Sequence, residues 1–250
     1  MKRLYTLLFC ICIFNLNAFS QATKDAADTA YQQEKFRTAI SMYEELLSKE
    51  GASASVYYNL GNSYFKLKSY GKAILQYERA LLLEPGDEDI LHNLSVAKSK
   101  TVDKIIPRNK TFIALWWENS IQAFHETTWS IVGIICFILC LGGVLVYFFV
   151  QKLSWRKVGF FSACIAAPLC LFANYAAYLQ AQRITEHQTA IVMQAAIMVK
   201  STPANTGTDL FLIHEGTKVE IQEGLSNEWY EVRLADGKKG WIPQNSVERI

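Results

Sequence analysis

The chain has 250 residues, of which 51% are hydrophobic, and it carries a net charge of only +2. A charge this close to neutral, with no basic stripe along the chain, argues against a nucleic-acid-binding protein, and we expect no nucleic-acid partner. All six cysteines lie in strongly apolar stretches (Cys10, Cys12, Cys136, Cys140, Cys164 and Cys170), so neither a disulfide framework nor a zinc site is expected in the polar parts of the chain.

The first 20 residues have the three parts of a secretory signal peptide. Lys2 and Arg3 form a basic start, Leu4–Phe14 is an apolar core, and Ala18–Ser20 is a small-residue cleavage site. We therefore predict a signal peptide that directs the following residues out of the cytoplasm. An uncleaved signal anchor is the alternative, and it would leave those residues on the same side.

Residues 21–104 have a helical pattern that repeats. In the clearest copy, Ala54–Asp87, aromatic and small residues and a final proline recur at fixed spacings: Tyr57, Leu60, Gly61, Tyr64, Ala73, Tyr77, Ala80 and Pro85. This segment resembles a tetratricopeptide repeat. A degenerate copy precedes it, and Glu88–Lys104 is predicted to be a single capping helix. Because so short an array is marginal alone, we expect a partner or an assembly to complete the stack.

The resemblance to tetratricopeptide repeats implies a concave face that binds peptides or proteins. The residues that it places on this face are Lys24, Asp28, Tyr31, Gln32, Tyr58, Asn62, Phe65, Lys66 and His92, with Val96 continuing the surface. Lys24 and Asn59 fit two places of the family's carboxylate clamp, but Asp28, Asp89 and Asn93 occupy the others, so no clamp is expected. The alternative for each position is an ordinary solvated residue.

The segment before the first long apolar run is rich in aromatic and apolar residues: Phe112, Ile113, Leu115, Trp116, Trp117, Ile121 and Phe124. We predict an amphipathic helix that lies on the outer membrane–water interface. A binding surface for a partner's helix is the alternative.

Two apolar runs, Ile131–Val150 and Val158–Leu179, contain no charged residue. As helices they would each be about 30 Å long, which matches the hydrocarbon core of a bilayer. We predict two transmembrane helices rather than a buried helix pair of a soluble protein. The connection between them contains Lys152, Arg156 and Lys157 and no acid, so the positive-inside rule places it in the cytoplasm and both chain ends outside.

The second apolar run has a face of small and polar residues: Ser162, Ala166, Cys170 and Asn174. Small residues allow close approach of helix backbones. We therefore expect this face to pack against the first run at Gly142 and Gly143, with an interhelical hydrogen bond from Asn174.

From residue 190 the periodicity changes to short alternating strands. The predicted strands are Ile191–Ala195, Val219–Ile221, Trp229–Leu234 and Gly240–Pro243, with a turn at Asp236–Gly237 between the last two. The sequences of Glu215–Val219, Trp229–Val232 and Asp236–Pro243 resemble those of a bacterial SH3-like domain. The resemblance implies a ligand face at Trp229 and Pro243 that contacts cell-wall peptides or proteins, while Trp241 is expected to fill the barrel.

Catalysis has no support in the sequence. The chain has no nucleotide-binding loop, nucleophile elbow or zinc-protease motif, and its four histidines, His92, His125, His187 and His214, are scattered. We expect a non-enzymatic protein with no catalytic residues, no metal and no cofactor.

Together these features predict a multidomain membrane protein. In chain order, its predicted parts are a signal peptide (1–20), a helical tetratricopeptide module (21–104), a juxtamembrane amphipathic segment (105–129), a transmembrane helix (130–150), a cytoplasmic loop (151–157), a second transmembrane helix (158–179), a linker (180–189) and an SH3-like β-barrel (190–250). This order, together with the Leu91–Ile105 stretch, resembles the E-type proteins of the Bacteroides aerotolerance (Bat) operon. The resemblance implies a bacterial inner-membrane protein that acts beside von Willebrand-A-type membrane proteins and a MoxR-type ATPase in tolerance of oxygen or envelope stress.

Our leading hypothesis from the sequence is a two-pass adaptor of the inner membrane whose soluble modules are both periplasmic. Its partners would be other membrane proteins and the lipid bilayer. The alternative is a cell-wall sensor whose SH3-like domain binds peptidoglycan.

Overall fold

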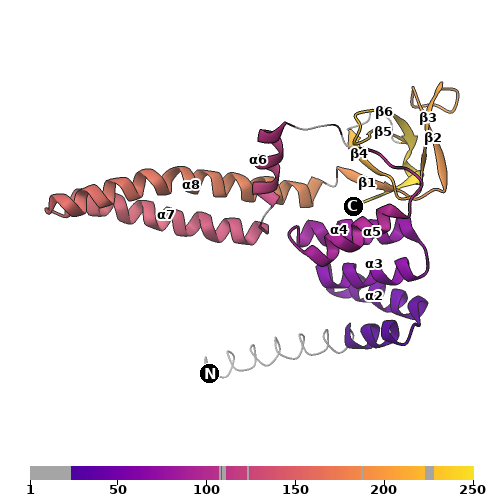
Figure 1. The fold of residues 1–250 in the computed structure, drawn as a ribbon, viewed down its shortest axis with the longest axis horizontal. Helices are drawn as coiled ribbons and strands as arrows, with labels where there is room; N and C mark the ends of the chain where they lie inside the picture. Colours follow the sequence, from indigo (N-terminus) through magenta and orange to yellow (C-terminus); the bar gives the residue numbers. More distant parts are fainter. Residues whose placement is uncertain (1–23, 107, 109–110, 123, 187, 223–227) are drawn as a thin grey trace, which may run out of the picture. The chain divides into compact units, whose positions relative to one another are not determined.

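The computed structural model describes residues 24–106, 108, 111–122, 124–186, 188–222 and 228–250 (Figure 1). The predicted signal peptide lies outside these residues. The chain divides into two units: Met1–Arg108 with His187–Ile250, and Asn109–Glu186. The first unit therefore joins the two polar parts of the sequence, and the second contains both apolar runs.

The N-terminal part of the first unit is a stack of antiparallel helices. After a helix over residues 24–32 come α2 (Phe36–Glu50), α3 (Ala54–Lys66), α4 (Tyr70–Leu83) and α5 (Glu88–Ser99). Glu34 and Lys68, one repeat length apart, both adopt the left-handed backbone conformation, with φ of 59° and 62°. The same turn therefore recurs between the paired helices, and the predicted helical repeat is confirmed.

Gly61 and Tyr77 show why α3 and α4 pack so closely. A Cβ atom on Gly61 would lie 2.7 Å from Cε1 of Tyr77, so only glycine leaves room for the tyrosine ring. The ring is almost fully buried. Gly61 therefore permits the close crossing of α3 and α4.

The capping helix α5 is shorter than predicted. Asp87 caps its N-terminus, and Oδ1 of this residue accepts a hydrogen bond from the Ile90 amide at 2.9 Å. It ends at Ser99 rather than Lys104, because Nζ of Lys104 turns back and donates to the carbonyl oxygens of Lys98, Ser99 and Thr101. A lysine at this end satisfies carbonyls that the helix leaves open.

The C-terminal part of the first unit is an antiparallel sheet in the order β3-β2-β6-β5-β4-β1-β7. Its strands are β1 (Thr189–Val192), β2 (Ala196–Lys200), β3 (Asp209–His214), β4 (Lys218–Gln222), β5 (Trp229–Arg233), β6 (Lys239–Pro243) and β7 (Val247–Arg249). The β5–β6 hairpin is confirmed, and Gly237 in its turn has a φ of 94° that glycine adopts readily. The prediction of one strand through Ala195 is wrong, because β1 ends at Val192 and β2 begins at Ala196. Strands β2, β3 and β7 were not predicted.

The second unit contains α6 (Phe112–Gln122) and a hairpin of two long helices, α7 (Glu126–Phe149) and α8 (Leu153–Glu186). Two segments, Thr127–Phe149 and Leu153–Gln182, are long and apolar enough to cross a membrane. Much of the predicted loop and most of the predicted linker are helical, since α8 begins at Leu153 and extends to Glu186. Arg156 contributes to the tight turn, because its Nε donates to the Tyr147 carbonyl at 3.1 Å.

The contact between α7 and α8 depends on Gly143. A Cβ atom there would lie 2.4 Å from Oγ of Ser162, whereas a Cβ on Gly142 would meet nothing within 4 Å. Of the two glycines predicted to receive α8, Gly143 alone does so. The predicted interhelical hydrogen bond of Asn174 is wrong, because its Nδ2 donates to Cys170 of its own helix at 2.8 Å.

Candidate functional site

The helical stack encloses a pocket of about 310 Å³. Its walls come from the helix over residues 24–32 and from α3, α4 and α5, and the lining residues are Tyr31, Tyr58, Asn62, Phe65, Lys66, Tyr77, Asn93 and Val96. Aromatic rings and a valine form the apolar surface, while two amides and one ammonium group supply polar contacts. This mixture is typical of a site that receives another molecule.

A chain of hydrogen bonds fixes the polar floor of this pocket. The Tyr77 hydroxyl donates to Oδ1 of Asn62 at 2.7 Å, and Nδ2 of Asn93 donates to the same oxygen at 2.9 Å. Nδ2 of Asn93 also donates to the Tyr58 hydroxyl at 2.9 Å. Burial raises the pKa of Tyr77, so its hydroxyl remains a neutral donor. Nδ2 of Asn62 and Nζ of Lys66 have no hydrogen-bond partner among the described residues. Both groups can therefore donate hydrogen bonds to a ligand.

The structure brings five of the predicted groove residues together in this pocket: Tyr31, Tyr58, Asn62, Phe65 and Lys66. Val96 lines the same pocket. Gln32 and His92 are exposed and lie outside its lining.

Lys24 and Asp28 belong to a separate polar cluster. Asp28 accepts hydrogen bonds from the Tyr43 hydroxyl at 2.5 Å and from Nδ2 of Asn59 at 3.0 Å. Nζ of Lys24 lies 3.6 Å from the same carboxylate. These contacts join the first helix to α2 and α3, so this carboxylate has a structural role in the stack.

The groove prediction did not include Tyr77 or Asn93. Tyr77 was identified only as a position of the repeat motif, but the space beside Gly61 lets its hydroxyl reach Asn62. Asn93 was considered only as an obstacle to a carboxylate clamp. Gly61 is the sequence feature that could have indicated the position of Tyr77, because a residue without a side chain leaves space for a large ring beside it.

The predicted ligand face of the SH3-like domain is largely covered. Trp229 begins β5 and is only 8% exposed, and it lies opposite the half-buried Pro243 at the end of β6. Trp241, which was expected to fill the interior of the barrel, is more exposed than Trp229. A ligand-binding role of Trp229 stays a prediction, and the side chain offers little surface for it.

The sheet packs on the helical stack through apolar side chains from both ends of the domain. Ile191 of β1 and the C-terminal Ile250 are buried in the same cluster as Ile74 of α4. Gly216 permits close approach, since a Cβ atom there would lie 2.6 Å from Cγ2 of Thr101 and 3.1 Å from Cδ1 of Ile74. The α4 surface of the stack is therefore covered by the sheet.

Two charged residues of α4, Glu78 and Arg79, stabilise the contact between the sheet and the helical stack. Glu78 is buried, and its carboxylate lies 2.7 Å from Nζ of Lys98 and 2.6 Å from Nζ of Lys218 on β4. Burial opposes ionisation of Glu78, but the two lysines outweigh burial and lower the pKa of its carboxyl. Arg79 donates to Glu248 at 3.0 Å and to the Arg249 carbonyl at 2.7 Å.

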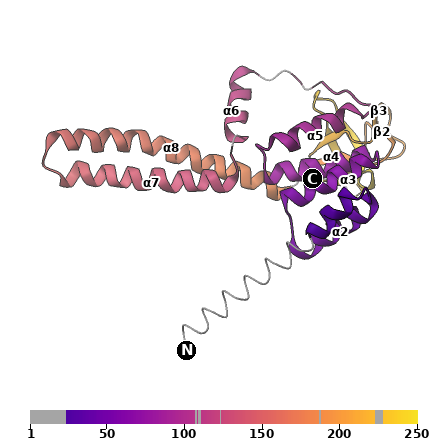
Figure 2. The same ribbon diagram turned by 60° about the horizontal axis from the view of Figure 1, so that its bottom comes forward.

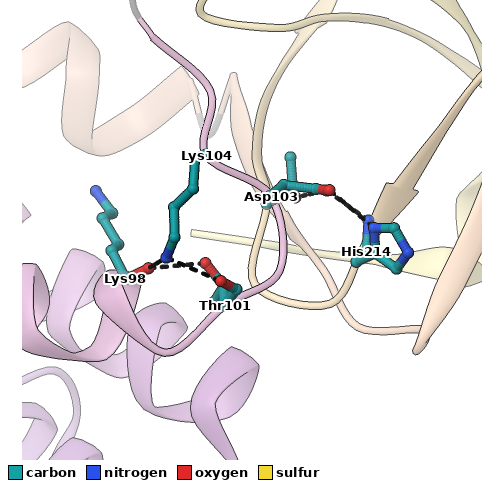
Figure 3. Close-up of polar contacts among 6 residues, drawn as sticks. Lys98, Thr101, Asp103, Lys104 and His214 are labelled. Carbon is teal, nitrogen blue, oxygen red and sulfur yellow. Dashed lines mark hydrogen bonds and ion pairs between the residues drawn. The ribbon is translucent and has the colours of Figure 1, made fainter.

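The segment after α5 forms a second attachment, shown in Figure 3. Asp103 accepts hydrogen bonds from the His214 amide at 2.7 Å and from the Thr217 hydroxyl at 2.7 Å, and one of its oxygens lies 2.8 Å from Nδ1 of His214. Burial would raise the pKa of Asp103, but the bonds from Thr217 and His214 lower it. Ile105 then packs against the interior of the sheet. The two modules thus form one body.

Among the residues that the structure describes, no group of three or more histidine, cysteine or acidic side chains could hold a metal ion. The carboxylate of Glu78 pairs with lysines from both modules, and that of Asp103, which follows the helical stack, accepts hydrogen bonds from the sheet domain. Their role in the described structure is to join the modules.

Comparisons with protein families find two matching models. Residues 24–89 match a tetratricopeptide repeat, and residues 201–250 match a variant SH3 domain. No curated protein matches the chain. The SH3 match begins after β2, so β1, which packs on α4, lies outside it. The chain thus contains tetratricopeptide repeats and a variant SH3 domain, two modules that suggest protein–protein interaction.

Proposed function

We propose that this protein is a non-enzymatic adaptor whose helical pocket holds a segment of a partner protein at a membrane. The observation that carries the proposal is the pocket itself. Aromatic walls from Tyr31 and Phe65 surround two donors, Nδ2 of Asn62 and Nζ of Lys66, that have no hydrogen-bond partner among the described residues. Apolar walls with a few fixed donors suit a peptide segment, which has apolar side chains and backbone carbonyl oxygens.

Membrane anchoring by the α7–α8 hairpin is part of this proposal. Both helices are long and apolar enough to cross a bilayer, and their connection carries Lys152, Arg156 and Lys157. Basic residues favour the cytoplasmic side, so we place this turn in the cytoplasm and the modules in the periplasm of a bacterial inner membrane. The resemblance to E-type Bat proteins supports von Willebrand-A-type membrane proteins as partners and a role in tolerance of oxygen or envelope stress.

The cell-wall alternative has less support. A peptidoglycan-binding SH3-like domain would need an accessible ligand residue, and the residue expected for this task, Trp229, is buried. The covered β1 side of the sheet is also unavailable, because Ile191 packs in the helical cluster.

The proposal is tested by photo-crosslinking in the native host. A crosslinking amino acid replaces Lys66 in the pocket or Lys35, an exposed lysine of the same module that does not line the pocket. We expect the Lys66 position to form adducts with membrane proteins and the Lys35 position to form far fewer. Equal adducts from both positions, or none from Lys66, would contradict the proposal.

A further inference from the structure

Helix α6 is attached to the hairpin in an unusual direction. Figures 1 and 2 both show it roughly perpendicular to α7 and α8, within the same unit. If the hairpin crosses a membrane, a helix at right angles to it lies along the membrane plane. This geometry raises the question of what covers its outer face.

The inner face of α6 is firmly held by the hairpin. The Trp117 ring lies 5.4 Å from that of Phe172 and 6.3 Å from that of Tyr175. At the C-terminal end of α6, the Ile121 carbonyl accepts hydrogen bonds from Nε1 of Trp129 at 3.0 Å and from Nε2 of Gln180 at 3.1 Å. Buried side chains therefore replace water as partners of this helix end, as an apolar environment requires.

The outer face of α6 is apolar and unpartnered in the described structure. Phe112 is 82% exposed, Ile113 is 75% exposed and Trp116 is 58% exposed. The first charged residue of the helix is Glu118, so its N-terminal half has no charge. Exposed apolar side chains of this kind are costly in water, and the hairpin exposes many apolar side chains as well.

The attachment points also fix the depth of α6. Phe172, Tyr175 and Gln180 lie near the end of the Leu153–Gln182 segment that is remote from the basic turn. This end coincides with one boundary of the bilayer if the hairpin spans it. Tryptophan is favoured at that boundary because its ring is apolar and its N–H is polar.

We propose that α6 is an in-plane membrane anchor that inserts Phe112, Ile113 and Trp116 into the lipid of the leaflet opposite the basic turn. The occupant of its outer face is the bilayer itself, since that face is apolar and uncharged and α6 is attached near one end of the membrane-spanning segment. The inference rests on the proposed membrane insertion of the hairpin. The anchor would hold the start of the second unit, which follows Arg108 in the sequence, at the membrane surface.

Depth-dependent fluorescence quenching tests the inference on the full-length protein in phosphatidylcholine and phosphatidylglycerol vesicles. All six native cysteines are replaced by alanine, and a polarity-sensitive dye is attached to one new cysteine at a time. Ile113→Cys and Trp116→Cys report on α6, Ile165→Cys on the exposed face of α8, and Ser95→Cys on α5. The quenchers are aqueous iodide and lipids that carry a nitroxide near either the headgroup or the chain end.

We expect the α6 dyes to show blue-shifted emission, protection from iodide and the largest loss of fluorescence with the headgroup-proximal nitroxide. The Ile165 dye should respond most to the chain-end nitroxide, and the Ser95 dye to iodide. Iodide quenching of the α6 dyes with normal lipid quenching at Ile165 would overturn the inference while leaving the hairpin inserted. Protection of the α6 dyes from all quenchers would mean that protein covers this face, which also overturns it. Iodide quenching at Ile165 would reject membrane insertion and the inference together.

Discussion

Glu78 joins the helical and sheet modules through two ion pairs. Its side chain is only 8% exposed, so an ionised carboxylate there would be costly without partners. Lys98 comes from the capping helix and Lys218 from β4, so the charge is compensated from both modules at once. A buried charge that depends on two modules penalises their separation, because either module alone would leave it incompletely paired.

We predict that Glu78→Gln lowers the free energy of unfolding by about 1–3 kcal/mol at neutral pH, the range for loss of a buried charged hydrogen-bond partner. Because the folded state lowers the pKa of Glu78, its contribution is present above the ordinary value of 4.5 and is lost as the pH falls through the folded pKa. Denaturant unfolding of both proteins between pH 7 and pH 3 (about the range that spans this titration) should show the difference shrinking in acid.

Lys98→Gln is the matched control for this substitution. Lys98 is 44% exposed and Lys218 remains beside Glu78, so the expected loss of stability is smaller. A difference between wild type and Glu78→Gln that persists unchanged in acid would show that the carboxylate charge is not the stabilising feature.

At the level of single residues, the sequence identified the pocket well where a repeat fixed the geometry. Tyr58, Asn62 and Phe65 follow from the spacing of the first helix in the repeat, and the structure places all three in one pocket. The sequence alone could not show that Glu78 and Asp103 connect the helical module to the sheet module. Their partners, Lys218 and His214, are more than a hundred residues away, and no local pattern records a contact of that range.

Among the elements, the hairpin shows how one glycine decides a helix–helix contact. Gly143 lies against the backbone oxygen of Gly159 and the hydroxyl of Ser162, while its neighbour Gly142 faces open space. We predict that Gly143→Ala costs about 1–3 kcal/mol because the added methyl group forces the helices apart. Gly142→Ala, with the same chemical change, should be nearly neutral or slightly stabilising, since alanine favours a helix.

The mole fraction of sodium dodecyl sulfate that unfolds the protein in mixed micelles measures both variants. Gly143→Ala should unfold at a lower fraction than wild type, and Gly142→Ala should not. Equal behaviour of the two variants would show that the close approach at Gly143 does not limit the stability of the hairpin.

Elements with a clear periodicity were predicted with good accuracy, and those without it were missed. The helical repeat and the two long apolar helices have strong patterns that local sequence determines. Strand β3 contains Leu210, Phe211 and Leu212 in an unbroken run, which lacks the alternation expected of a half-buried strand. The start of α8 was placed too late because Trp155 and Arg156 are polar or interfacial residues that still continue the helix into the turn.

At the scale of the whole molecule, the C-terminal domain packs on the short repeat array. From the sequence we expected a partner or an assembly to complete the stack, and such a partner stays a prediction. In the structure, Ile191, Met193 and Ile250 of the C-terminal domain pack against the helical cluster and cover part of the stack. The pocket on the other helices is therefore presented by a single body rather than by a module on a flexible linker, which lowers the entropy lost when a partner binds.

Hydrogen exchange of the full-length protein in detergent, comparing wild type with Ile191→Ala, tests most directly whether the two modules are one body. Loss of this buried side chain should cost about 2–5 kcal/mol, and we predict faster exchange of amides in both β1 and α4. Leu212→Ala on β3, where the side chain is 46% exposed, is the control and should change neither. Faster exchange confined to the sheet, with α4 exchanging as in wild type, would contradict the account.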